Sequence, residues 1–191
     1  MKNVPALPAV LVVDDEVRSQ EALRRTLEED FTVFTASGAD EAMAIMEREQ
    51  GASGGKGVQV VLCDQRMPGT SGVAFLTEVR QRWPDVVRIV LSGYTEAGDI
   101  IAGINEAGIY QYLLKPWQPE QLLLTLKSAA NVWRLQQDNQ RLSLELRAAE
   151  PVLASKVEMK YERVKRELGL DGLTRSAGSP MNPVCDMVQR I

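Results

Sequence analysis

Short apolar runs alternate with longer amphipathic segments along roughly the first two thirds of the chain. The runs are rich in β-branched residues, are bounded by turn residues, and occupy 9–13, 31–36, 58–63, 86–93 and 109–114. Such runs are typical of strands that a parallel sheet buries on both faces. The segments between them have helical length and cover 17–30, 40–50, 72–83 and 95–108. This alternation predicts right-handed βαβ crossovers, and therefore an α/β fold with a (βα)5 doubly wound parallel sheet.

The first of these helical segments is the most clearly amphipathic. Val17, Leu23 and Leu27 share one side of the helix predicted over 17–30. We expect this side to be apolar and to face the sheet.

A different pattern begins in the helix that opens after Pro119. Its first turns carry leucines suited to the core, and its apolar positions then follow steps of three and four residues. The seam that these steps define consists of Val132, Leu135, Asn139, Leu142, Leu146 and Ala149. An asparagine at an a position of such a seam favours a parallel two-stranded coil. Because the seam is short, an amphipathic helix lying on its own domain remains the alternative. Pro151 is expected to end this helix, with a second, charged helix over 152–168.

Acidic residues and one lysine follow three of the predicted strands. Asp14 and Asp15 follow the first strand, Asp64 follows the third, and Lys115 with Pro116 follows the fifth. In doubly wound sheets the ligand crevice lies outside the carboxyl ends of the strands, so these groups are expected to converge there. Three carboxylates and an ammonium suit one divalent cation and one phosphoryl group.

Composition excludes several classes of function. The chain has 22 Lys and Arg against 26 Asp and Glu, a net charge of −4, which gives no electrostatic reason to bind nucleic acid or an anionic membrane. No apolar run approaches the length of a membrane span. The two cysteines, Cys63 and Cys185, are far apart in sequence, which favours a reducing, cytoplasmic setting over a disulfide scaffold. The absence of histidine excludes histidine-based metal ligation and catalysis, so a histidine-borne phosphoryl group must come from another protein.

The strand ends carry a joint pattern that is more specific than any one of its residues. The motifs VVDDE, CDQRMPGTSG, VLSGYT and YLLKPW follow one another at successive strand ends. Together they resemble the receiver domain of two-component response regulators over about residues 7 to 128. The resemblance implies a flavodoxin-like receiver fold, a phosphoryl acceptor rather than an enzyme, and a sensor histidine kinase as partner.

The resemblance also implies roles for individual residues. Asp64 matches the phosphoryl acceptor, and Asp15, Asp64 and the backbone carbonyl of Arg66 match the ligands of Mg²⁺, with Asp14 holding the ion through water. Mg²⁺ suits such a set because it keeps several waters and takes few carboxylates.

Three further residues match the switch of the family. Ser92 matches the hydroxyl that moves toward the phosphoryl oxygen, and Tyr112 the aromatic side chain that changes rotamer with it. Lys115 matches the cation that pairs with another phosphoryl oxygen, and the peptide bond between Lys115 and Pro116 is expected to be cis.

Within this family the chain is similar to the nitrogen-regulator (NtrC) class, particularly its hydrogenase-gene regulators. DQRMPGTSGVAFL, Trp117 and the long fifth helix carry this similarity. It implies a receiver domain over 1–128, a linker helix over 129–150, and a linker with the incomplete start of an AAA+ ATPase domain over 151–191. The seam described above predicts that the linker helix is a coiled coil that forms a homodimer. The chain carries no phosphate-binding loop: Gly55 and Lys56 are followed by Gly57 rather than Ser or Thr. ATP hydrolysis and DNA contact are therefore not expected from these residues.

Two alternatives share some of these features. A phosphohydrolase of the haloacid-dehalogenase type also uses Mg²⁺ and a strand-end aspartate, but needs its two key aspartates two positions apart in one loop, whereas Asp14 and Asp15 are adjacent. A stand-alone receiver that passes phosphate to a second histidine protein is the other alternative. The extended helix after Pro119 argues against it.

Overall fold

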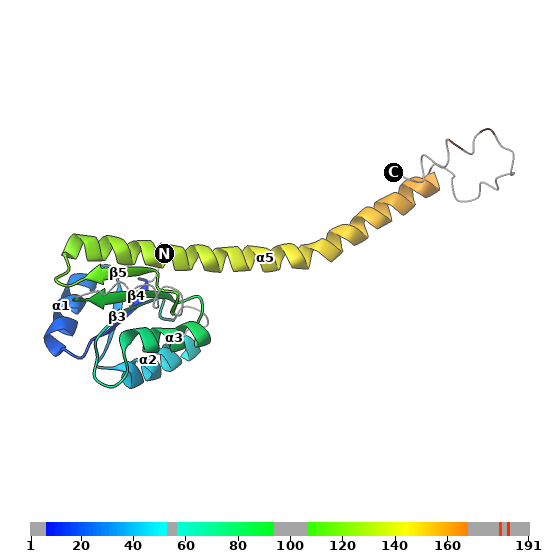
Figure 1. Cartoon of the computed structure of the whole chain (residues 1–191). Helices are drawn as coiled ribbons and strands as arrows, with labels where there is room; N and C mark the ends of the chain where they lie inside the picture. The colour runs from blue at the N-terminus through cyan, green and yellow to red at the C-terminus, as the bar shows by residue number, and fades with distance from the viewer. Residues whose placement is uncertain (1–6, 53–56, 94–106, 168–179, 181–182, 184–191) are drawn as a thin grey trace. The chain divides into compact units, whose positions relative to one another are not determined.

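The computed structural model describes residues 7–52, 57–93 and 107–167, together with residues 180 and 183. The elements are β1 (Ala9–Val13), α1 (Val17–Leu27), β2 (Thr32–Ala36), α2 (Ala39–Ala52), β3 (Val60–Asp64), α3 (Gly72–Arg82), β4 (Val87–Ser92), β5 (Gln111–Leu114) and α5 (Pro119–Glu167) (Figure 1). The five strands lie where the apolar runs predict them. Most of the helix predicted over 95–108 lies outside the described residues.

The five strands form one parallel sheet in the order β2-β1-β3-β4-β5. The chain builds the sheet outward from β1 in both directions, so the topological switch point lies between β1 and β3. In register, Val13 of β1 faces Cys63 of β3, and Asp64 of β3 faces Leu91 of β4. A sheet of this order opens its ligand crevice at the carboxyl ends of β1 and β3.

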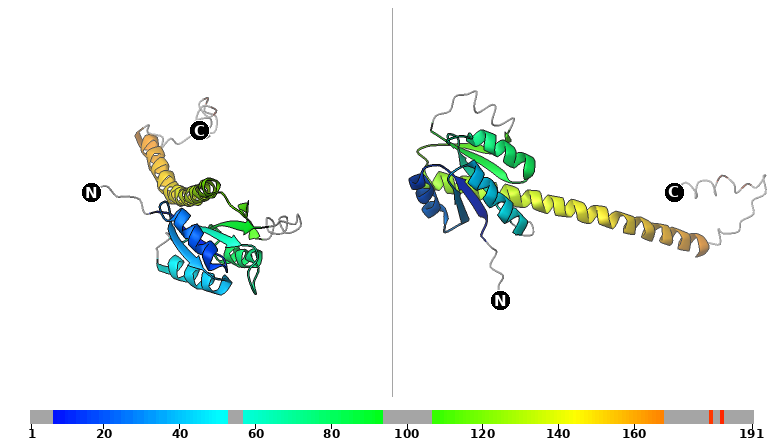
Figure 2. Two further views of the ribbon diagram at one scale, coloured as in Figure 1. Left: turned by 90° about the vertical axis from the view of Figure 1, so that its left-hand side faces the viewer. Right: turned by 90° about the horizontal axis from the view of Figure 1, so that it is seen from below.

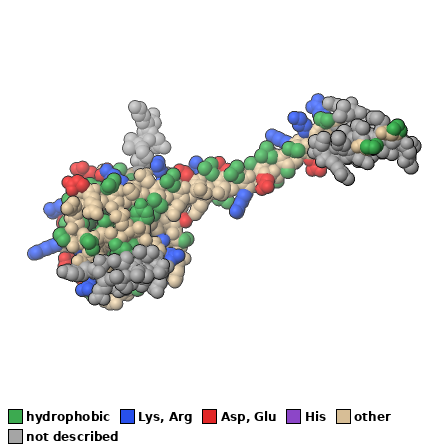
Figure 3. All heavy atoms as spheres, turned by 45° about the horizontal axis from the view of Figure 1, so that its top comes forward, with side chains coloured by type: hydrophobic (Ala, Val, Ile, Leu, Met, Phe, Trp, Pro, Cys, Tyr) green, Lys and Arg blue, Asp and Glu red, His purple; other side chains and the backbone are tan. Residues whose placement is uncertain are grey.

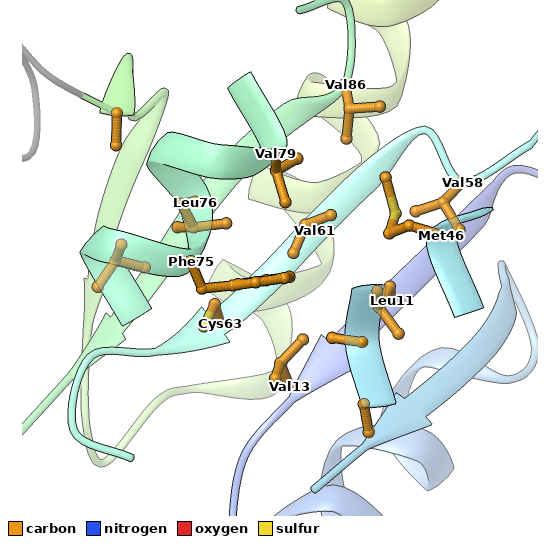
Figure 4. Packing of buried hydrophobic residues seen from close by; sticks show 14 of the residues in the cluster. Leu11, Val13, Met46, Val58, Val61, Cys63, Phe75, Leu76, Val79 and Val86 are labelled. Carbon is orange, nitrogen blue, oxygen red and sulfur yellow. The ribbon is translucent and has the colours of Figure 1, made fainter. Parts of the chain in front are cut away.

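Helices cover both faces of the sheet, and two apolar cores result. Residues of α2 and α3 pack on one face, where Phe75, Leu76 and Val79 meet Leu11 and Val61 of the central strands (Figure 4). On the other face, α1 and the first turns of α5 pack against the sheet (Figure 2). This arrangement confirms the doubly wound α/β prediction and explains why β1 and β3 are apolar at successive positions.

The first helix differs from its predicted form at both ends. Leu23 and Leu27 are fully buried as expected, but Val17 is 74% exposed. Val17 opens α1 beyond the carboxyl end of β1, where the sheet offers no surface to cover. The helix ends at Leu27 rather than at residue 30, because Asp30 and Phe31 both turn back to bond the Leu27 carbonyl.

The chain divides into two compact units, Met1–Gln140 and Arg141–Ile191, and α5 contributes residues to both. In the first unit, α5 buries Leu122, Leu126 and Ala129 against the sheet. In the second, residues 141–150 are all exposed. No helix in the described part of the chain is both long and apolar enough to cross a membrane.

The prediction that Pro151 ends the helix is wrong, because α5 continues through it to Glu167. Proline lacks the N–H that would bond the Arg147 carbonyl, which disfavours a helix interior. The flanking segments consist largely of Leu, Glu, Arg, Lys and Ala, the residues with the highest helix propensity. Their summed preference outweighs the single missing bond, so residues 152–167 of the predicted second helix are part of α5.

Candidate functional site

Four strand ends bring the predicted site residues to one edge of the sheet. Asp14 directly follows β1, Asp64 is the last residue of β3, Ser92 is the last residue of β4, and Lys115 directly follows β5. Because all strands are parallel, these positions share the carboxyl edge. The sequence prediction that they converge is confirmed for Asp14, Asp64 and Lys115, which are in direct contact.

Asp14 is completely buried, and both of its carboxylate oxygens are bonded. Its Oδ1 accepts the backbone N–H of Glu16 at 2.9 Å, and its Oδ2 accepts the Ser19 hydroxyl at 2.7 Å and the Lys115 ammonium at 2.9 Å. The Gln20 amide also donates to the Asp14 backbone carbonyl at 2.7 Å. A buried carboxylate is tolerated only when it is satisfied in this way.

Ser19 and Gln20 were not identified from the sequence. Both lie in the first turn of α1, five and six residues after the aspartate that they contact. A helix that starts beside the site turns its first polar residues back toward the strand end. That placement is the signal that could have revealed them.

Lys115 bridges the two aspartates. Its Nζ donates to Asp14 Oδ2 and to Asp64 Oδ2, both at 2.9 Å, and its side chain is 26% exposed. Burial acts to lower the pKa of Lys115, but the hydrogen bonds and negative charges of Asp64 and Asp14 outweigh it and raise the pKa above the usual 10.5. Because its pKa is raised, the Lys115 ammonium carries a positive charge at this edge at neutral pH. The peptide bond between Lys115 and Pro116 is cis, as predicted.

Asp15 completes a cluster of three carboxylates. One oxygen from each of Asp14, Asp15 and Asp64 lies within 4.8 Å of the others. Asp15 is exposed, Asp64 is half-buried and Asp14 is buried, so the cluster opens to solvent on one side. Hard carboxylate oxygens with room for waters are the ligands that Mg²⁺ prefers, so the residues present fit this ion.

The other predicted site residues lie around this cluster. Arg66 has an exposed side chain two positions after Asp64, Ser92 is 2% exposed, and Tyr112 is half-buried in β5. The Ser92 backbone carbonyl accepts the backbone N–H of Lys115 at 2.8 Å, which ties the ends of β4 and β5 together. Tyr112 packs against the core formed with α2 and α3.

A glycine that the sequence reasoning missed supports the acceptor strand end. The backbone N–H of Gly72 donates to the Gln65 carbonyl at 3.0 Å, and a Cβ at Gly72 would collide with the Asp64 carbonyl. Ser71 precedes it and caps α3 by accepting the Ala74 N–H at 3.2 Å. Only glycine lets α3 begin this close to β3. The signal was present in the sequence, since Gly-Thr-Ser-Gly follows Pro68.

The predicted dimer seam lies on the surface. Val132 is half-buried against the core beside α1, whereas Leu135, Asn139, Leu142 and Leu146 are exposed. The exposed fractions of the three leucines are 62%, 52% and 72%. Figure 3 shows apolar side chains along the surface of this helix. The alternative of a helix lying on its own domain therefore holds for the turns up to Gln140, where Gln137 and Gln140 still contact Asp85, and does not account for the exposed leucines of the seam.

Comparison with known proteins identifies the fold and the sequence group. Residues 10–127 match the model of the response regulator receiver domain. The hydrogenase transcriptional regulatory proteins HoxA of Cupriavidus necator and of Bradyrhizobium diazoefficiens are 53% and 47% identical, each over 95% of this chain and 36% of the relative. The chain thus spans about 36% of the length of these curated relatives.

Two solved structures show the same architecture. The signal receiver domain of an HD domain-containing protein from Pseudomonas fluorescens is 27% identical with a TM-score of 0.64, covering 72% of this chain and 97% of that one. NtrX from Brucella abortus, solved with ADP, is 25% identical with a TM-score of 0.63, covering 71% of this chain and 30% of that one.

Proposed function

Since this chain belongs to the response regulator receiver family, in the group of the NtrC-class hydrogenase regulators, we propose that it accepts a phosphoryl group from a sensor histidine kinase on Asp64. The single observation that carries the proposal is the Lys115 ammonium held 2.9 Å from both Asp14 and Asp64 at the carboxyl edge of the sheet. This contact holds one oxygen of Asp64, and the half-buried carboxylate is partly open to solvent.

The proposed reaction is a transfer between two proteins. A carboxylate oxygen of Asp64 attacks the phosphorus of a phosphohistidine on the kinase, the P–N bond breaks, and its electron pair returns to the imidazole. The product is an acyl phosphate on Asp64. Lys115, already beside Asp64, is placed to pair with a phosphoryl oxygen and offset an added charge of about −2.

Asp14, Asp15 and Asp64, with the backbone carbonyl of Arg66, would hold Mg²⁺ in this proposal. When bound, the ion supplies positive charge that draws phosphoryl oxygens to the site. The buried Asp14, bonded by Ser19 and Lys115, is positioned to act through water, while the exposed Asp15 is free to approach the ion directly.

Ser92 and Tyr112 are the proposed switch. Ser92 closes β4 at the same edge as Asp64 and is nearly buried, so its hydroxyl is close to where phosphoryl oxygens would lie. Tyr112 lies two positions before the end of β5 and is half-buried, so a rotamer change would expose or withdraw it. The state of Asp64 would thereby reach the surface around β4 and β5.

The linker helix is the proposed output. We propose that α5 pairs with its copy in a parallel homodimeric coil, with Val132, Leu135, Asn139, Leu142 and Leu146 along the interface. Their heptad spacing and the exposure of the last four support this pairing. The whole regulator would act in the cytoplasm to control transcription through ATPase and DNA-binding domains in the remainder of the protein.

Phosphorylation with a small-molecule donor tests the proposal. Wild-type protein incubated with acetyl phosphate and Mg²⁺ is expected to gain one phosphoryl group by intact mass, and chelating the metal is expected to prevent it. Asp64→Asn should abolish labelling. Asp40→Asn, which removes an exposed acid at the start of α2 outside the carboxylate cluster, should leave labelling unchanged. Stable labelling of the Asp64→Asn protein at Asp14 or Asp15 would contradict the assignment.

A further inference from the structure

Two rows of side chains run along α5: one packs on the sheet, and the other is exposed apart from the half-buried Val132 at its start. One row packs on the sheet and consists of Leu122, Leu126, Ala129 and Trp133, followed one and two turns later by Gln137 and Gln140. The other is the predicted seam, which begins at Val132. At about 100° per residue, the two rows lie roughly 100° or more apart around the helix.

The sheet-facing row changes from apolar to polar where the sheet ends beneath it. At that point it meets Asp85, a half-buried aspartate in the turn between α3 and β4. Asp85 Oδ2 accepts the Gln137 amide at 3.2 Å, and Asp85 Oδ1 accepts the Gln140 amide at 3.0 Å. One carboxylate thus holds two successive turns of the helix with both of its oxygens.

A groove lies beside this contact. It has a volume of about 510 Å³ and is lined by Asp85, Val132, Leu135, Gln136, Asn139 and Gln140. Three of these residues belong to the first heptads of the seam. The contact with Asp85 therefore fixes which way the seam opens, since any rotation of α5 about its axis would separate the glutamines from the aspartate.

We propose that Asp85 is a positioning residue that locks the rotational setting of α5 on the receiver, so that Val132, Leu135 and Asn139 face a second copy of the chain. The lock is a property of one chain. Its consequence for pairing rests on the homodimer proposed above.

The position of Asp85 gives the lock a connection to the site. It lies between the end of α3 and the start of β4. The opposite end of α3 begins at Gly72 against the Asp64 backbone, and the opposite end of β4 is Ser92. Two regular elements thus run from the proposed phosphorylation site to the turn that holds the linker helix.

Spin-label distances test the lock directly. Labels at Gln81→Cys in α3 and Asp138→Cys in α5, both exposed and both in the first compact unit, in a Cys185→Ser background with Cys63 buried, would be measured after dilution with excess unlabelled protein, so that only distances within one chain are seen. The otherwise wild-type protein should give one narrow distance distribution. Asp85→Ala should at least double its width, and Gln137→Ala with Gln140→Ala should reproduce that effect from the helix side.

Two variants serve as matched controls. Asp30→Ala removes a different aspartate that contacts α5, through Lys127 at 2.8 Å, where the buried leucines already hold the helix. Gln136→Ala removes a neighbouring glutamine that lines the groove. Both should keep the narrow distribution. A broad distribution in otherwise wild-type protein, or equal widths with and without Asp85, would overturn the lock.

Sedimentation separates the lock from the dimer. If the lock orients the seam, Asp85→Ala should weaken self-association three- to ten-fold without altering labelling of Asp64. A monomeric wild-type protein would overturn the proposed dimer and the role of the lock in pairing, while the distances would still decide whether Asp85 holds the helix. Unchanged association in Asp85→Ala protein with a broadened distribution would remove the pairing consequence.

Discussion

The carboxyl edge of the sheet and the outer turns of α5 depart from the usual distribution of residues in opposite ways. The edge gathers charges, including a fully buried Asp14, whereas residues 141–150 place apolar side chains in water. Charge burial and apolar exposure both cost free energy unless a partner compensates. At the edge, Lys115 supplies part of the compensation from within the chain. On the helix, the described residues supply none. The edge is thus suited to a small charged ligand and the helix to another polypeptide.

The largest effect is expected from placing a charge on the seam. Leu142→Glu should weaken self-association at least 100-fold, about 3 kcal/mol, because pairing would bury two uncompensated carboxylates opposite each other. Sedimentation equilibrium measures the change. Leu144→Glu is the matched control, since Leu144 is 66% exposed and lies off the seam, and it should leave association unchanged. If Leu142→Glu protein is still fully dimeric, pairing occurs through the receiver and α5 is only a linker.

A smaller change of opposite sign is expected at the one polar seam position. Asn139→Leu should strengthen association about tenfold and loosen its stoichiometry, because a buried asparagine costs stability yet fixes register when two copies align. Mass photometry across a concentration series would show trimers or tetramers beside dimers. Stronger association with a strict dimer would indicate that Asn139 does not specify the oligomer.

The sequence predicted the fold well because burial leaves a strong local pattern. The runs that became β1 and β3 are apolar at every buried position, and β4 departs from this only at Arg88 and Ser92, so the type and order of these strands followed from the sequence alone. Val17 was misplaced because spacing gives the side of a helix but not how far the sheet extends beneath it. The prediction that Pro151 ends the helix was wrong because it considered the helix-breaking effect of one residue and left out the summed helix propensity of its neighbours.

The candidate site was predicted where motifs mark it and missed where geometry alone creates it. Asp14, Asp64 and Lys115 can be recognised in the sequence because each is a charged residue at the end of an apolar run. Ser19 and Gly72 cannot, because an ordinary serine and glycine become site residues only through the closeness of α1 and α3 to the strand ends. The contact of Asp85 with Gln137 joins residues 52 positions apart, and no spacing in the sequence marks it.

Removing the exposed acid at the carboxyl edge of the sheet should relieve the repulsion among the three carboxylates. In metal-free buffer, Asp15→Asn should raise the free energy of unfolding by about 0.5–1 kcal/mol, because three carboxylates within 4.8 Å share one ammonium. Asp14→Asn should lower the free energy of unfolding, because the two oxygens of this buried carboxylate accept three hydrogen bonds. Urea unfolding measures both. Saturating Mg²⁺ should reverse the order of wild type and Asp15→Asn, since only wild type gains the full binding energy. Equal stabilities with and without Mg²⁺ would contradict a metal site here.

The smallest expected effect is on stability at high pH, where Lys115 loses its positive charge. The folded-state pKa of Lys115 is raised, so its contribution to stability is fully present below the unfolded pKa of about 10.5 and declines as pH rises through the higher folded value. In metal-free buffer, the stability difference between wild type and Lys115→Gln should therefore be constant from about pH 7 to 10 and shrink above that. Lys127→Gln is the control: Lys127 pairs with Asp30 but is 51% exposed, so solvent screening leaves little difference to lose. A Lys115 difference that stays constant up to pH 12 would show that its packing, rather than its charge, holds the edge together.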